Sequence, residues 1–367
     1  MIKTFLVSSV LIVFFVFENL SALPRFSVKL RDRCIDCHYN PSGGIIRNEG
    51  GWHWGKNTLS MISTPDKDFI MSPRISENIS VGIDYRTQYL YSQEKKSTDF
   101  QNMSGSIYSN FGLSKEINII AKYDFVNRIW EGYGVARILP NKSYIKVGSF
   151  TPNFGLRIDD HTAYTRGGDF GLLFSQGVYR GLIYNPFYNE TGIELGVYGG
   201  KFLYATASIG ANNVSPSRAL AKDPTYTTRI ELTPNLGELG LIMGGSFSSA
   251  NVPDKVTMFG GFFGLGFDEF SLLAEFDIAD NLLAQQMKSS VFMVEASYGL
   301  ITGLDAIVRY DRIDPNTDLN KDEASRLIFG FEFQPYSFIE IRPQYRLQIE
   351  NPSVDNDSFV LQFHFWY

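Results

Sequence analysis

The last ten residues of the chain, Ser358-Phe-Val-Leu-Gln-Phe-His-Phe-Trp-Tyr367, decide how the fold is interpreted. Apolar side chains occupy every second position: Phe359, Leu361, Phe363 and Phe365. Successive side chains of a β-strand point to opposite faces, so a period of two predicts a strand with one apolar face. His364 falls on the opposite face, and the final residue is aromatic.

The same alternation recurs from about residue 74 to the end of the chain. In residues 79–89, for example, Val81 and Ile83 alternate with Gly82 and Asp84. Comparable runs occupy residues 117–125, 192–198, 226–232, 272–278, 291–298, 304–310, 327–333 and 339–347. Turn residues such as Asn-Pro and Asp-Pro-Asn separate the runs. We estimate roughly sixteen strands, with about fourteen or eighteen as alternatives.

Two architectures have this pattern. A soluble β-sandwich or propeller also alternates. Long strands with one apolar face and one face of Gly, Ser, Thr or charged residues favour a membrane barrel with a polar lumen. Aromatic residues near strand ends fit interfacial girdles: Tyr89, Tyr91, Tyr108, Phe111, Trp130, Tyr133, Tyr179, Tyr184, Tyr336 and Phe338. The C-terminal strand resembles that of bacterial outer-membrane barrels, so we expect an all-β, antiparallel barrel surrounded by outer-membrane lipid.

Composition narrows the function. The 367 residues carry a net charge of −6 without a basic face, which argues against nucleic-acid binding. No catalytic triad, P-loop or nucleotide fingerprint is present, so we predict a carrier rather than an enzyme. Gly264-Leu265-Gly266 lacks a strand–turn–helix context and is interpreted as strand glycines that face the lumen.

The N-terminus predicts export. Lys3 precedes an apolar run from Phe5 to Phe17, which is too short to span a bilayer as a helix. We interpret residues 1–22 as a signal peptide with cleavage near Ala22; an uncleaved membrane anchor is the alternative. Residues 23–73 then form a distinct segment with little regular structure, and residues 74–367 form the barrel.

Both cysteines of the chain fall in Cys34-Ile-Asp-Cys37-His38, the attachment signature of c-type haem. Two thiols one helical turn apart can reach both vinyl groups of one haem, and His38 then lies under the iron as the proximal ligand. The motif therefore predicts one haem c. The alternatives are a redox or structural Cys34–Cys37 disulfide, or half of a zinc site that lacks a second cysteine pair.

The sequence leaves the roles of the other candidate haem-site residues open. Arg47 could bind a haem propionate through its guanidinium fork or lie solvated in a loop. The distal iron ligand is assigned first to His161 and second to His53, with Met61, Met71 or water remaining. His161 lies in a polar loop long enough to reach into the barrel mouth, although an ordinary surface loop is the common alternative. His364 is expected to face the lumen without binding iron.

An export signal, a single Cys-x-x-Cys-His and a C-terminal barrel together resemble the fused monohaem cytochrome–porins, which include the iron-oxidising outer-membrane cytochromes. The run from Cys34 to Asn48, with Phe150-Thr-Pro-Asn-Phe-Gly-Leu-Arg157 and Asp160-His161-Thr162, is more similar to haem-bearing porins of metal-respiring bacteria. The resemblance implies electron transfer at or across the outer membrane, with periplasmic or extracellular multihaem cytochromes as partners. The alternatives are a diffusion porin whose haem segment is a plug or sensor, and a barrel without haem.

Overall fold

A computed structural model describes most of the chain. The described residues are 24–31, 33–65, 72–158, 160, 162–168, 181–185, 188–212, 224–234, 236–251, 255–350, 353 and 355–367. The predicted signal peptide and the candidate ligands Met71 and His161 lie outside them. No helix among these residues is long and apolar enough to cross a membrane.

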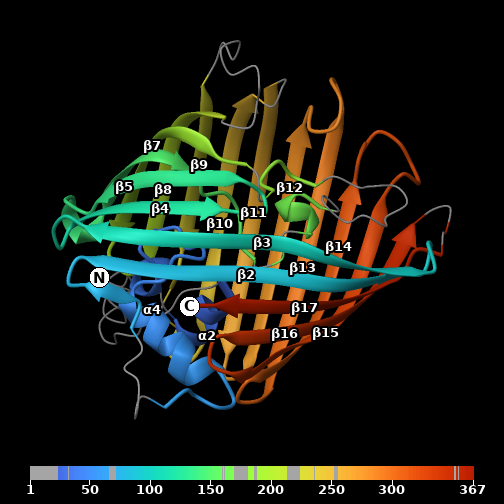
Figure 1. Ribbon diagram of the computed structural model, residues 1–367. Helices are drawn as coiled ribbons and strands as arrows, with labels where there is room; N and C mark the ends of the chain where they lie inside the picture. Colours follow the sequence, from blue (N-terminus) through green and yellow to red (C-terminus); the bar gives the residue numbers. More distant parts are fainter. Residues whose placement is uncertain are drawn as a thin grey trace, which may run out of the picture.

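The chain is a closed antiparallel barrel (Figure 1). Within the described residues, sixteen strands from β2 to β17 pair with their sequence neighbours, and β17 pairs with β2 to close the sheet. A short strand, β1 (Arg74–Ser76), also pairs with β2. The strands are β2 (Ile79–Ser92), β3 (Ser97–Gly112), β4 (Ile117–Asp124), β5 (Ile129–Ala136), β6 (Tyr144–Phe150), β7 (Glu190–Gly199), β8 (Leu203–Asn212), β9 (Thr225–Leu232), β10 (Gly240–Asn251), β11 (Lys255–Phe267), β12 (Phe270–Asp280), β13 (Lys288–Ile301), β14 (Leu304–Asp314), β15 (Ala324–Tyr336), β16 (Ile339–Glu350) and β17 (Ser358–Trp366). The predicted fold class and the estimate of sixteen strands are confirmed.

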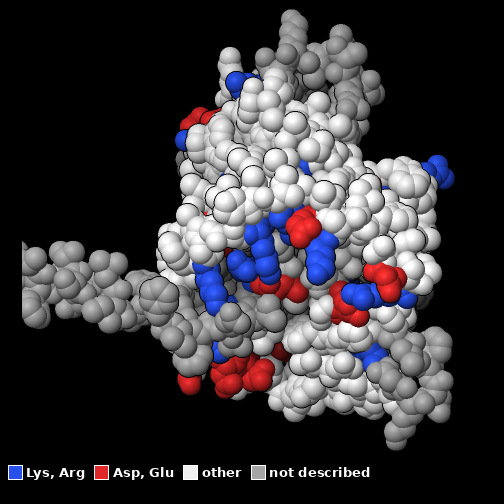
Figure 2. All heavy atoms as spheres, turned by 90° about the vertical axis from the view of Figure 1, so that its left-hand side faces the viewer, with Lys and Arg blue, Asp and Glu red and all other residues white. Residues whose placement is uncertain are grey.

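The two faces of the barrel differ as the alternation predicts. In β2, Asp84 and Arg86 are buried on the inner face, whereas Ile83 is 42% exposed on the outer face. In β12, Asp277 is buried and Phe276 is 46% exposed. An apolar exterior and a polar interior are the arrangement that a lipid bilayer requires. Figure 2 shows charged side chains gathered in a central hollow of one side of the molecule, within largely uncharged surroundings.

The assignment to an aromatic girdle is wrong for three of the predicted residues. Trp130 is 65% exposed, as a girdle position requires, but Tyr108 and Tyr133 are 5% and 4% exposed and lie on the inner face. Tyr184, 6% exposed, belongs to a loop inside the barrel. Tyr108 follows the outward-facing Ile107, so strand alternation places it inside, where its hydroxyl donates to the backbone oxygen of Tyr367 at 2.8 Å. Nearness to a strand end therefore did not reveal which face these tyrosines occupy; Tyr179 lies outside the described residues.

Two parts of the chain enter the lumen. The first, the N-terminal segment (residues 24–65), contains short helices joined by irregular stretches (Figure 1). The second, the lumen loop, comprises the described residues between β6 and β7, which are 151–158, 160, 162–168, 181–185 and 188–189. Their helices, with one 3₁₀ turn between β5 and β6, are α2 (Pro24–Leu30), α3 (Cys34–Cys37), α4 (Glu49–Trp54), the π-helix η1 (Gly55–Leu59), η2 (Pro140–Lys142) and η3 (Tyr164–Arg166).

Strand glycines make room for the N-terminal segment. A Cβ added to Gly266 would lie 2.4 Å from the carbonyl carbon of Val28 in α2, a distance at which atoms overlap. Gly264 likewise faces Val28, whose side chain would be 3.1 Å from an added Cβ. The prediction that these glycines face the lumen is confirmed, and α2 takes up the space they leave.

Candidate functional site

The cysteine motif forms one helical turn inside the barrel. The amide of His38 donates to the carbonyl oxygen of Cys34 at 2.9 Å, which closes α3 and places both cysteines on the same turn. The two cysteines do not form a disulfide; Cys37 is buried and Cys34 is half-buried. Burial raises the pKa of the Cys34 thiol to about 11, and the charge of Glu231 acts in the same direction. The Cys34 side chain is therefore a neutral thiol at pH 7.

His38 is oriented by the loop that follows it. Its Nδ1 lies 3.2 Å from the carbonyl oxygen of Ile46. A carbonyl oxygen can only accept, so Nδ1 carries the proton and the lone pair resides on Nε2. Burial, and next the charge of Arg47, lower the pKa of His38 to about 3. The imidazole is consequently neutral, which is the form that binds a metal.

The intervening loop needs glycine. Gly43 and Gly44 have φ values of 83° and 112°, in the region that L side chains rarely adopt. The loop forms a tight turn, in which the amide of Gly43 donates to the carbonyl oxygen of Asn40 at 2.9 Å. This turn brings Ile46 back beside His38.

Asn48 joins the motif to the next helix. Its Nδ2 donates to the carbonyl oxygens of Ile35 and Asp36 at 3.3 and 3.0 Å, while its Oδ1 accepts from the amide of Gly51 at 2.9 Å. It therefore caps the C-terminal carbonyls of α3 and the N-terminus of α4 together. Gly51 allows the two helices to touch, because an added Cβ would lie 2.2 Å from the carbonyl oxygen of Cys37. We did not single out either residue from the sequence, although Asn before a helix is a known capping signal.

Helix α4 packs on the end of the last strand. The ring of Trp52, 1% exposed, lies 5.3 Å from the rings of Phe338 and Tyr367. At Gly55, an added Cβ would be 2.6 Å from the indole of Trp366. The N-terminal segment thus docks on the seam where β17 meets β2.

The motif opens onto a cavity of about 340 Å³ inside the barrel. Cys34, Cys37 and His38 line one part of it, and Arg47 lines the same cavity. The guanidinium of Arg47 lies 4.2 Å from the ring centre of Trp366, and its Nη1 is buried without a hydrogen-bond partner among the described residues. The cavity size falls within the range of about 300–1,000 Å³ that is typical of cofactor sites.

The lumen loop supplies the facing wall. Phe154, Arg157 and Tyr184 line the cavity from this loop. The amide of Leu156 donates to Glu275 of β12 at 2.9 Å, which anchors the loop to the barrel wall. The prediction that this stretch reaches into the barrel is confirmed.

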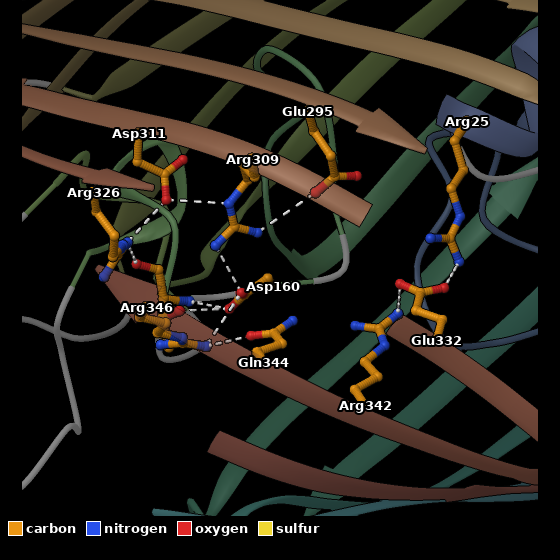
Figure 3. A network of polar contacts seen from close by, with 11 residues as sticks. Arg25, Asp160, Glu295, Arg309, Asp311, Arg326, Glu332, Arg342, Gln344 and Arg346 are labelled. Atoms are coloured by element: carbon orange, nitrogen blue, oxygen red, sulfur yellow. Dashed lines mark hydrogen bonds and ion pairs between the residues drawn. The ribbon is translucent and has the colours of Figure 1, made fainter. Parts of the chain in front are cut away.

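Ion pairs hold both inner segments against β13 to β16 (Figure 3). Asp160 of the lumen loop accepts from Arg309 at 2.8 Å and lies 3.5 Å from Arg346. Arg25 of α2 pairs with Glu332, which also pairs with Arg342 at 2.8 Å. Buried carboxylates on the loop and the wall are thus matched by arginines across the lumen.

The distal ligand stays a prediction. His161 is outside the described residues, but its neighbours Asp160 and Thr162 are buried in the lumen, where Arg326 donates to the Thr162 carbonyl at 2.8 Å. His53 is on α4, with its side chain 45% exposed and 4.0 Å from Glu49, and it does not line the cavity. Met61 is 43% exposed.

Two further assignments can be placed. Among the described residues lining the cavity, His38 is the only histidine and there is no methionine. His364 faces the lumen as predicted, with Nε2 2.9 Å from Asp84 and Nδ1 2.7 Å from Glu340. No group of three potential metal ligands among His, Cys, Asp and Glu occurs in the described part of the chain.

Comparison with known proteins supports the architecture. No protein-family model matches the chain, and no curated protein matches it. Among solved structures, the outer membrane channel DcaP of Acinetobacter baumannii has a TM-score of 0.54 at 13% identity, covering 81% of this chain and all of DcaP. OprB of Pseudomonas putida has a TM-score of 0.58 at 11% identity, covering 79% of this chain and 94% of OprB. OmpF of Salmonella typhi has a TM-score of 0.52 at 11% identity, covering 79% of this chain and 98% of OmpF.

The chain has the barrel fold of these outer-membrane channels. The three matched proteins are aligned over nearly their whole length, so the similarity concerns the complete barrel. At this level of identity the likeness establishes the fold alone.

Proposed function

We propose that this outer-membrane barrel carries one c-type haem in its lumen and transfers electrons at or across the outer membrane. The observation that carries the proposal is the cavity onto which two cysteine side chains and one neutral histidine open together. The cysteine turn lies inside the barrel, where side chains of the lumen loop and of the barrel wall line the same cavity. When bound, a haem iron cycles between two oxidation states and exchanges one electron at a time.

The residues present fit a haem. Cys34 and Cys37 would each add their S–H across a vinyl double bond, with sulfur on one carbon and hydrogen on the other, so no oxidant is consumed. His38 offers Nε2 because Nδ1 is engaged by the Ile46 carbonyl at 3.2 Å. Arg47 has a buried, unpartnered Nη1 at the cavity, which suits a propionate oxygen.

A partner is needed for transfer across the membrane. The apolar band of such a barrel is about 25 Å tall. One haem beside the N-terminal segment covers only part of that distance, so a periplasmic or extracellular multihaem cytochrome would complete the path. The direction of transfer depends on the potentials of those partners.

A diffusion porin is the second candidate, and the comparisons favour it. DcaP is an outer membrane channel, and its fold is matched over its whole length. In this alternative the N-terminal segment serves as a plug or sensor, held by contacts such as the Arg25–Glu332 pair. A barrel without haem, with a Cys34–Cys37 disulfide, is a third possibility that the first experiment separates from the others.

The first experiment tests covalent haem. The protein is produced with a cytochrome c maturation system, and a denaturing gel is stained for haem. We expect one haem band that is lost in Cys34→Ser and retained in the control Asp36→Asn, which changes a residue inside the motif without removing a thiol. A wild-type chain without the band would overturn the haem assignment.

The second experiment separates electron transfer from diffusion. Liposomes containing the barrel enclose reduced methyl viologen and a soluble periplasmic multihaem cytochrome, and ferric citrate is added outside. A conduit oxidises the internal dye without admitting small sugars in a swelling assay, and Cys34→Ser abolishes the oxidation. Rapid swelling, with dye oxidation that is the same in the wild type and in Cys34→Ser, would instead support the diffusion porin.

A further inference from the structure

Two arginines at the cavity stand apart from the other cations around it. Arg86, Lys122, Arg166 and Arg229 line the cavity and are each within 3.5 Å of a carboxylate oxygen. Arg47 and Arg157 also line it, but neither has an ion-pair partner in the described part of the chain. Both side chains are half-buried at the cavity, and a partly desolvated guanidinium without a counter-ion attracts an anion supplied from elsewhere.

Both side chains are held in place without being neutralised. Arg47 stacks on the ring of Trp366 at 4.2 Å, a contact that fixes its plane and leaves its N–H groups available. Arg157 donates through Nη2 to the carbonyl oxygens of Thr151 and Pro152 at 2.8 and 3.1 Å. These bonds orient the guanidinium but leave its charge uncompensated.

The two arginines come from different inner segments. Arg47 belongs to the N-terminal segment and Arg157 to the lumen loop, and both line the same cavity. Two different inner segments therefore each supply a guanidinium to it. A guanidinium binds a carboxylate through paired N–H donors, so two of them suit a ligand with two carboxylates.

We propose that Arg47 and Arg157 form a binding site for a pair of carboxylates, and that Arg157 is the second residue of this site. Under the proposed function, on which this inference rests, the carboxylates are the two propionates of the haem. In a diffusion porin the same chemistry would bind a free dicarboxylate solute. The site would also join the ligand to both inner segments.

The test begins with haem content in detergent-solubilised wild type, Arg157→Gln, Arg157→Lys and the control Arg312→Gln. Arg312 is 41% exposed and already paired with Asp314 at 3.5 Å, so it matches the charge change away from the cavity. All four proteins are expected to hold one haem, since the thioethers do not depend on Arg157. Heat-modified migration on gels confirms that each barrel is folded.

The deciding measurement is the reduction midpoint potential. Removing a positive charge beside the propionates favours the oxidised iron, so Arg157→Gln should lower the equilibrium constant for reduction about ten-fold, or about 59 mV for one electron. Arg157→Lys should restore most of the loss, and Arg312→Gln should match the wild type. An unchanged potential in Arg157→Gln, with haem bound, overturns the inference while the proposed function stands.

A second arm covers the other source of carboxylate. If the wild type carries no haem, succinate is applied to single channels in planar bilayers. A block that is lost in Arg157→Gln but kept in Arg312→Gln would support the site for a free solute, although the haem proposal fails. No succinate effect in a haem-free wild type would overturn both.

Discussion

Asn48 offers a direct test of how the cysteine turn is held. Alanine at this position removes three side-chain hydrogen bonds, at 2.9, 3.0 and 3.3 Å. At a conservative net value of about 0.7 kcal/mol for each, docking of α3 on α4 loses about 2 kcal/mol. Serine keeps an acceptor for the Gly51 amide but loses both donors, so it should cost about 1.4 kcal/mol.

Amide hydrogen exchange measures these losses in the folded barrel. The amides of His38 and Trp52, which donate to Cys34 and Asn48 carbonyls at 2.9 Å, should exchange about 30-fold faster in Asn48→Ala and about ten-fold faster in Asn48→Ser. Asn57→Ala is the matched control, because Asn57 is exposed in the same segment. If Asn48→Ala exchanges no faster than this control, the double cap does not hold the turn.

Further predictions concern the lumen. Gly266→Leu places atoms where the Val28 backbone lies, so α2 should be expelled and trypsin should cleave the N-terminal segment of folded barrels. Asp160→Asn weakens the buried contact to Arg309, so the lumen loop should loosen and single-channel conductance should rise. The pKa of His38 is lowered from 6.5 to about 3, so the undocked segment binds more protons between these values. In a variant with both cysteines changed to serine, docking of the N-terminal segment should be stable above pH 6.5 and weaken as the pH falls towards 3. Amide hydrogen exchange in this segment, corrected for the pH dependence of the intrinsic exchange rates, measures the change. An unchanged tryptic pattern, an unchanged conductance and a flat pH profile would each contradict one of these predictions.

The sequence predicted what depends on local periodicity. Alternation alone assigns Ile83 to the outer face and Asp84 to the inner face, because strand geometry fixes the direction of each side chain. The same rule placed His364 in the lumen. The cysteine motif was visible for the same reason, since its three functional residues lie within five positions.

Contacts made across the barrel were not predictable in this way. Arg157 and Asn48 matter because of what surrounds them, and their neighbours come from other segments of the chain. Alternation from the outward-facing Ile107 would have placed Tyr108 inside, but its partner there, the backbone oxygen of Tyr367, is 259 residues away. Pairings of this kind appear only when strand register and loop docking are known.

The contact between Trp52 and Tyr367 has a consequence for biosynthesis. The N-terminal segment is translated before the part of its docking surface that Tyr367 supplies, which follows β17 in the chain. It cannot take its final position until Tyr367 has been synthesised and β17 has paired with β2. Throughout export the thiols of Cys34 and Cys37 are therefore on an undocked chain, accessible to enzymes that could not enter the finished lumen.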